Sequence, residues 1–297
     1  MKPPVRLVGL VALFAFSAFS ACASEPGRVF HLPALYHVGY WVRDIAKSRA
    51  FYKDYLGYEE PYYLNRPTGE LQMVVMKVNE RQVIYLFTDA TKILPNGDNL
   101  DHLGLETDNI AAAREHLLAQ GIKVGNVNRG RIGDLLLGVK DPDGHYFEIT
   151  QFAPEGQLLQ HQGKNLAPGR VSAHLRSATI AVADLSAALH FYVDILGFRK
   201  IPGPVGVTRV QVPDGSDYLD LSPYERKLGA DAARGVPDFS LEVDDASQTF
   251  ATLSTRAKSL GLPAPSPVTA GSDGRRQTTC IDPDGTRVIL KESNPHP

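Results

Sequence analysis

The sequence predicts an α+β protein in which one domain is present twice. Short motifs recur about 140 residues apart along the 297-residue chain. The recurring pairs are Phe51-Tyr52 with Phe191-Tyr192, Leu56-Gly57 with Leu196-Gly197, and Asp141-Pro142-Asp143-Gly144 with Asp282-Pro283-Asp284-Gly285. This period exceeds the roughly 20 to 50 residues of solenoid repeats, so it indicates a duplicated domain. Strand and helix patterns alternate within each copy, which favours a mixed α and β architecture.

The elements expected in the first copy follow from two periodicities. Alternation of apolar and polar residues predicts strands at Leu35–Val42, Gln72–Val78, Gln82–Thr88, His102–Thr107, Leu135–Val139 and Tyr146–Gln151. Helical periodicity predicts helices at Ile45–Leu56 and Ile110–Gln120. Each copy therefore contains a strand-helix-strands unit twice.

The composition fits two ordinary globular domains. The chain is 43% hydrophobic and 22% charged, as expected for domains that each bury a core. We assign residues 31–152 to the first domain and 171–293 to the second. Residues 153–170 between them are polar, with two prolines and three glycines, and are predicted to be a linker.

The charge pattern excludes one class of partner. The formal net charge is −2, and no run of lysine or arginine stands out. A nucleic-acid-binding domain needs a basic surface for the phosphate backbone. We therefore expect no nucleic-acid partner, and the chain is expected to be a monomer or a homodimer.

Residues 1–23 have the pattern of an export signal. Lys2 and Arg6 precede an apolar run from Leu7 to Phe19, which is too short for a membrane-spanning helix. This segment is expected to be removed, leaving a periplasmic or secreted protein.

Two processing sites compete at the end of this segment. Ala21-Cys22-Ala23 is an Ala-x-Ala cleavage site, which would release a soluble protein. Ser20-Ala21-Cys22 resembles the end of a bacterial lipobox, in which Cys22 would carry a lipid and attach the protein to a membrane; Phe19 departs from that motif. With Cys280 as the other cysteine, no disulfide framework is predicted.

Strand periodicity also assigns side chains to the two faces of the sheet. In the first strand, Tyr36 and Val38 are expected to face the helices, and His37 the opposite side. By the same alternation His102 and Glu148 share the face of His37. The three side chains would then lie together on the concave face of a curled sheet.

At these residues the chain resembles the vicinal oxygen chelate superfamily, which includes glyoxalase I, extradiol dioxygenases, and fosfomycin- and bleomycin-resistance proteins. The matching motifs are Tyr36-His37-Val38-Gly39, Phe51-Tyr52 before Leu56-Gly57, Asp101-His102-Leu103-Gly104-Leu105, and Asp141-Pro142-Asp143-Gly144 before Glu148. The resemblance covers nearly all of the mature chain, twice. It implies tandem βαβββ units that form two modules with cupped mixed sheets.

The resemblance implies a metal site in the first module. Carried over position by position, His37, His102 and Glu148 are the ligands, and the fourth position falls on Tyr85. Two histidines and one carboxylate with open positions suit one divalent ion, Fe(II), Mn(II) or Zn(II). In the second module Ser177, Asp238 and Ile289 replace the three ligands and Asp220 lies near the fourth position, so that module is expected to bind no metal.

The resemblance implies an enzyme whose small substrate chelates the metal through vicinal oxygens. The ligand set is dioxygenase-like, but Gly138 stands where ring-cleaving relatives typically have a tyrosine, and those relatives usually hold their metal in the C-terminal module. Two alternatives are a glyoxalase-type lyase or isomerase that uses a redox-inert metal, and a non-catalytic protein that sequesters its ligand, as in bleomycin resistance.

Four other residues are candidates for the site. Tyr85 is the candidate catalytic residue, since its hydroxyl can donate a hydrogen bond or a proton. Trp41 shares the face of His37, and Arg129 and Arg131 precede the strand at Leu135; these three are candidates for substrate binding. The Asp141–Gly144 motif is predicted to be a structural turn.

Overall fold

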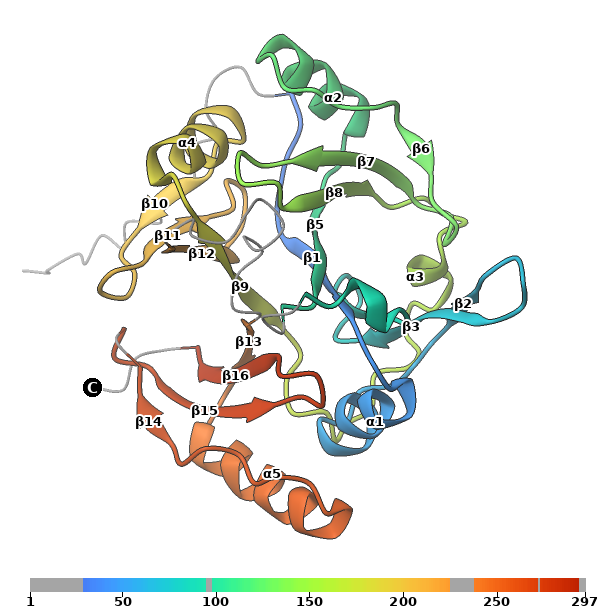
Figure 1. The fold of residues 1–297 in the computed structure, drawn as a ribbon, viewed down its shortest axis with the longest axis vertical. Coiled ribbons are helices and arrows are strands. Elements are labelled where there is room, and N and C mark those ends of the chain that lie inside the picture. Colours follow the sequence, from blue (N-terminus) through green and yellow to red (C-terminus); the bar gives the residue numbers. More distant parts are fainter. Residues whose placement is uncertain (1–28, 95–97, 225–237, 272, 294–297) are drawn as a thin grey trace, which may run out of the picture.

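The computed structural model describes residues 29–94, 98–224, 238–271 and 273–293. Within these ranges the chain forms two eight-stranded sheets, one from each copy of the repeat (Figure 1). The first sheet contains β1 (Leu35–Trp41), β2 (Tyr63–Asn65), β3 (Leu71–Lys77), β4 (Val83–Phe87), β5 (Leu100–Glu106), β6 (Asn128–Arg129), β7 (Leu135–Lys140) and β8 (Tyr146–Gln151). The second contains β9 (Leu175–Val182), β10 (Arg199–Ile201), β11 (Thr208–Gln211), β12 (Tyr218–Pro223), β13 (Asp238–Val243), β14 (Thr269–Ala270), β15 (Arg276–Ile281) and β16 (Arg287–Glu292).

Both sheets have the same strand order, which confirms the predicted fold class of tandem modules. The first runs β2-β3-β4-β1-β5-β8-β7-β6 and the second β10-β11-β12-β9-β13-β16-β15-β14. The periodicity missed β2 and β6, because strands of three and two residues are too short to show alternation. With them, each half of the first sheet is a βαβββ unit.

Each module has two main helices on the convex side of its sheet. The first module contains α1 (Ile45–Arg49), which continues as the π-helical turn η1 (Ala50–Tyr55), and α2 (Ile110–Ala119); the second contains α4 (Leu185–Leu189), η3 (His190–Ile195) and α5 (Ala246–Leu260). A short 3-10 turn, η2 (Ala90–Lys92), follows β4. The carboxylates of Asp44, Asp184 and Asp245 accept hydrogen bonds from backbone N–H groups of the first turn of α1, α4 and α5. Such caps fix where these helices begin.

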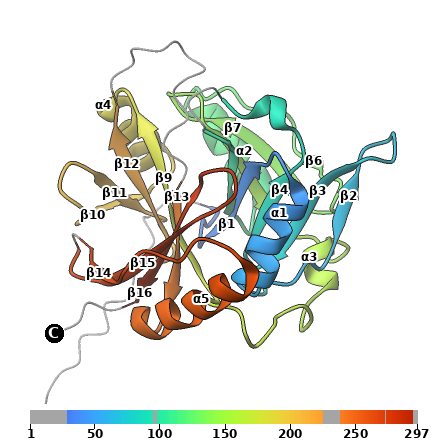
Figure 2. The same ribbon diagram turned by 60° about the horizontal axis from the view of Figure 1, so that its bottom comes forward.

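The two modules pack against each other within one chain. A continuous apolar core contains residues of both modules, and α5 lies beside η1 (Figure 2). The repeated motifs meet at this interface. Tyr52 donates to Asp282 at 3.0 Å and Tyr192 donates to Asp141 at 2.8 Å, with all four side chains buried. The Phe-Tyr motif of each copy therefore holds the Asp-Pro-Asp-Gly turn of the other.

Residues 153–170, which join the modules, are packed on the first sheet. They contain a short helix, α3 (Gln157–Gln160), whose Leu158 is fully buried in the apolar cluster of the first cup. The fully buried Lys77 pairs with Glu80 and donates to the carbonyls of His161 and Lys164 at 2.6 and 2.8 Å. These bonds fix the segment in place.

Residues 1–28 lie outside the described part of the chain, so the predicted export signal and Cys22 have no structural description here. Among the described residues, no helix is long and apolar enough to cross a membrane.

Candidate metal centre

Three neighbouring strands of the first sheet bring the predicted ligands together. His37 lies on β1, His102 on β5 and Glu148 on β8; β1 pairs antiparallel with β5, and β5 pairs parallel with β8. Glu148 Oε2 lies 3.9 Å from His37 Nε2 and 3.5 Å from His102 Nε2, and one ligand atom from each residue lies within 4.8 Å of the others. Two ligands about 2.1 Å from one ion are about 3.0 to 3.4 Å apart, so small adjustments suffice to bind a common ion.

The imidazoles present buried nitrogens that have no hydrogen-bond partner. His37 is fully buried, and both of its ring nitrogens and Nε2 of His102 are unsatisfied. Buried polar atoms are nearly always paired in folded proteins, and leaving three unpaired is costly. A metal ion would accept the lone pair of one nitrogen of each ring, so the donor set fits a divalent cation.

The two imidazoles differ in their electrostatics. Burial and the neighbouring His102 lower the pKa of His37 well below its usual value, so its ring is neutral and has a free lone pair. Burial also disfavours the charged form of His102, but its hydrogen bond with Asp101 and the charge of Glu148 raise its pKa to about 9.

Asp101 fixes the orientation of His102. Asp101 Oδ2 lies 2.6 Å from Nδ1 of the ring, which leaves Nε2 directed at Glu148. A carboxylate on the outer nitrogen of a histidine ligand is a common device for holding the ring and raising its basicity.

Two glycines make room for the imidazoles. In the β1–β5 register Gly104 lies opposite His37, and Gly39 lies opposite His102. A Cβ on Gly104 would lie 2.3 Å from two atoms of the His37 ring, and a Cβ on Gly39 would lie 3.1 Å from Cε1 of His102. This role of the glycines was not predicted, although each histidine precedes one of them in a repeated His-x-Gly pattern, His37-Val38-Gly39 and His102-Leu103-Gly104.

Tyr36 corrects the face assignment made from the sequence. A β-bulge between Leu35 and His37 turns Tyr36 into the cup, instead of toward the helices. Its hydroxyl lies 2.6 Å from that of Tyr85. Strict alternation fails here because a bulge inserts one extra residue into the strand.

Tyr85 lies next to the triad but its hydroxyl is engaged elsewhere. Its ring centroid is 4.4 Å from that of His37, and the residue is 3% exposed. Burial, with the neighbouring Tyr36 and Tyr62, raises the pKa of Tyr85 well above its usual value. In this arrangement Tyr85 forms a wall of the site and is a neutral group.

The three residues predicted to bind substrate differ in the groups that they contact. Trp41 is half-buried at the rim, where its ring lies 5.2 Å from Phe87, and Phe87 lies 5.6 Å from His102. Arg129 pairs with the exposed Glu155 at 2.5 Å. Arg131 donates to the side chain of Gln72 and the carbonyl of Asn65. Both guanidinium groups thus bond to groups outside the triad, and their role in substrate binding stays a prediction.

The open side of the centre lies toward β8. The side chain of Glu148 is 20% exposed, compared with 0% for His37 and 5% for His102. Tyr146, on the same face of β8, has its ring 6.0 Å from His102. Burial and the charges of Glu148 and Asp101 raise its pKa. Tyr146 was not predicted as a site residue, although it shares the strand parity of Glu148.

The second module has a different set at the corresponding positions. Ser177 and Ser240 share a hydrogen bond of 2.6 Å, where the first module has His37 and Gly104. Asp220 accepts two hydrogen bonds from Arg209, at 2.7 and 2.8 Å. Throughout the described ranges, His37, His102 and Glu148 form the one group of three metal-ligating side chains.

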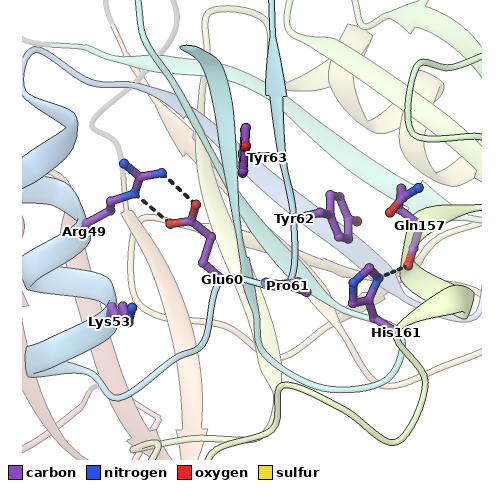
Figure 3. A pocket seen from close by; sticks show the side chains of 8 residues that line it. All are labelled: Arg49, Lys53, Glu60, Pro61, Tyr62, Tyr63, Gln157 and His161. Carbon is purple, nitrogen blue, oxygen red and sulfur yellow. Dashed lines mark hydrogen bonds and ion pairs between the residues drawn. The ribbon is translucent and has the colours of Figure 1, made fainter.

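A separate pocket of about 690 Å³ lies between α1 and α3 (Figure 3). It is lined by Arg49, Lys53, Glu60, Pro61, Tyr62, Tyr63, Gln157 and His161. Arg49 and Glu60 neutralise each other through two hydrogen bonds of 2.7 Å. None of these residues belongs to the triad, so the candidate chemistry lies elsewhere.

Comparison with solved structures shows the same fold in several enzymes. The Mn(II)-bound glyoxalase from Novosphingobium aromaticivorans aligns with a TM-score of 0.63 and 15% identity, over 89% of this chain and 83% of that one. The 2,3-dioxygenase LapB from Pseudomonas sp. KL28 gives 0.63 and 14%, over 90% and 94%. Homoprotocatechuate 2,3-dioxygenase from Arthrobacter globiformis gives 0.64 and 16%, over 93% and 84%.

At these identities the structural likeness establishes the fold and not the reaction. A search of proteins with curated functions finds no match. The sequence profile of the Glyoxalase/Bleomycin resistance protein/Dioxygenase superfamily matches residues 34–149 and again 173–290. The chain therefore belongs to this superfamily, with one domain in each module.

Proposed function

We propose that the protein is a metal-dependent enzyme with its active site in the first module. His37, His102 and Glu148 hold one divalent ion, Fe(II), Mn(II) or Zn(II), and a small substrate binds through two adjacent oxygens. The observation that carries the proposal is the convergence of the three side chains with buried, unpartnered imidazole nitrogens. When bound, the metal supplies Lewis acidity toward negative charge on the substrate oxygens and, if it is iron, redox chemistry with O2.

The residues of the chain position the reactants. Gly104 and Gly39 leave space for the rings of His37 and His102. Asp101 keeps Nε2 of His102 directed toward Glu148. A three-residue ligand set leaves coordination positions open for substrate. The partly exposed side of Glu148 gives the substrate its access.

The proposed reaction is dioxygenase-like, because a set of two histidines and one carboxylate suits a redox-active metal with a free position for O2. A glyoxalase-type lyase or isomerase is the second candidate, since Tyr85 packs on His37 at 4.4 Å. The hydroxyl of Tyr85 is bonded to Tyr36, so a proton transfer in that reaction requires a bound water or a rearranged Tyr85.

Elemental analysis of the purified protein tests this proposal. We expect about one equivalent of iron, manganese or zinc per chain, lost in His102→Ala and retained in the matched control Asp238→Ala, which changes the equivalent position of the second module. O2 consumption by the iron-loaded protein supports the dioxygenase, and turnover with zinc in the absence of O2 supports the lyase. Absence of metal, together with unchanged ligand affinity in His37→Ala, supports a binding protein instead.

The enzyme is proposed to act outside the cytoplasm. Lys2, Arg6 and the apolar run Leu7–Phe19 have the pattern of an export signal. Cell fractionation of the wild type and of Cys22→Ser distinguishes two routes. Membrane recovery that depends on Cys22 indicates lipidation, and soluble recovery of both proteins outside the cytoplasm indicates simple cleavage; retention in the cytoplasm contradicts export.

A further inference from the structure

Tyr146 lies where a ligand would approach the triad. It is the first residue of β8, two positions before Glu148 and therefore on the same face of the sheet. It is 37% exposed, and its ring lies beside that of His102 at 6.0 Å. An aromatic side chain that is half covered and adjacent to two of the three ligands forms part of the entrance to the site.

Gly138 gives the ring of Tyr146 its position. A Cβ on Gly138 would lie 2.2 Å from the hydroxyl oxygen of Tyr146 and 2.8 Å from two ring atoms. Any other residue at 138 would therefore displace the tyrosine.

The same glycine locates the hydroxyl relative to the triad. Gly138 pairs directly with Glu148 in the β7–β8 ladder, and Cβ positions of directly opposed residues are about 5 Å apart. The hydroxyl of Tyr146 therefore lies over the strand position next to Glu148, at the open side of the centre.

The hydroxyl is available to a ligand. Among the described residues, none forms a hydrogen bond with it. In the second module Arg287 takes the place of Tyr146 and Thr279 that of Gly138, as the strand registers show. The tyrosine and its glycine thus occur in the module that has the three metal ligands, and both are replaced in the module that lacks them.

We propose that Tyr146 is a substrate-contact residue whose hydroxyl donates a hydrogen bond to one of the two vicinal oxygens of the substrate. The inference rests on the proposed function, because it requires a ligand held in front of Glu148. It goes further by directing one of the two substrate oxygens toward the hydroxyl of Tyr146. Gly138 is the positioning residue that allows this contact.

Binding of 4-nitrocatechol to Mn(II)-loaded protein tests the inference. This planar probe carries two adjacent oxygens, and its visible absorbance reports its ionisation and binding. The variants are Tyr146→Phe, which removes the hydroxyl and keeps the ring, and Gly138→Ala, which pushes the hydroxyl aside. Tyr63→Phe is the control, because Tyr63 is a 57% exposed tyrosine on β2 that lines the separate pocket.

We expect both variants at the site to bind the probe roughly 3- to 10-fold more weakly, as the loss of one hydrogen bond predicts. Their manganese content and that of the control should equal the wild type. If the wild type binds the probe and Tyr146→Phe binds it equally well, the inference is wrong and the proposed function stands. If Tyr146→Phe loses manganese, the residue has a structural role. If the metal-loaded wild type does not bind the probe, the inference is wrong, while the metal content of the wild type and of His102→Ala still decides the proposed function.

Discussion

Gly104→Ala is expected to weaken metal binding strongly without changing any of the three ligand residues. The new Cβ would lie 2.3 Å from Cε1 and Nδ1 of His37 and 2.8 Å from Cγ. Ordinary contacts between such atoms are about 3.5 to 4 Å, so the ring must move by more than 1 Å. Gly104 lies opposite His37 in a paired strand, and neither strand can shift without breaking its ladder.

The magnitude follows from the tolerance of metal coordination. Metal–ligand distances are acceptable within about 0.2 Å of their ideal values, and the required displacement exceeds this several-fold. Even loss of an outer-shell hydrogen bond typically reduces metal affinity 10- to 100-fold. We therefore expect Gly104→Ala to weaken Mn(II) or Zn(II) binding by at least about 100-fold.

Gly39→Ala provides a graded comparison. Its Cβ would lie 3.1 Å from Cε1 of His102, which requires a movement of only a few tenths of an ångström. This variant should therefore weaken metal binding less than Gly104→Ala. Isothermal titration with Mn(II) measures both affinities, and thermal unfolding monitored by circular dichroism verifies that both variants are folded. Wild-type affinity in folded Gly104→Ala, or a larger effect of Gly39→Ala, would refute the reasoning.

Three further predictions follow from named contacts. Asp101→Asn should lower metal affinity about 10- to 100-fold in a competitive chelator titration, because it weakens the bond that orients His102; unchanged affinity would show that Asp101 has no such role. Tyr192→Phe should lower the free energy of unfolding in urea by about 1.5 to 3 kcal/mol, because it removes a buried hydrogen bond to Asp141 between the modules; an unchanged midpoint argues against that contact. A second metal site should form in the second module when Ser177→His, Asp238→His and Ile289→Glu are combined with Thr179→Gly and Ser240→Gly, as elemental analysis will show; binding by the triple variant alone would mean that the glycines are dispensable.

The sequence predicted the triad because its geometry depends on alternation within strands and on one family pattern. His37, His102 and Glu148 are far apart in the chain, but each lies on the face that period-2 parity assigns to it. The tandem architecture was predictable for a similar reason, since motifs such as Asp141–Gly144 and Asp282–Gly285 are preserved in both copies.

Other parts of the site depend on pairing between strands, which the sequence does not display. The bulge that turns Tyr36 into the cup arises where β1 meets β5. The roles of Gly104 and Gly138 become visible only when the register places them opposite His37 and Glu148. The joining segment was predicted from its polar, Gly- and Pro-containing composition, but the fully buried Leu158 and the buried Lys77 fix it to the sheet.

Anomalous X-ray diffraction from crystals of the manganese- or iron-loaded protein tests the central claim most directly. We predict one strong peak in the first module, within about 2.0 to 2.3 Å of a nitrogen of His37, a nitrogen of His102 and a carboxylate oxygen of Glu148. A fully loaded protein whose ion lies elsewhere, or whose ion contacts fewer than these three side chains, would contradict the account.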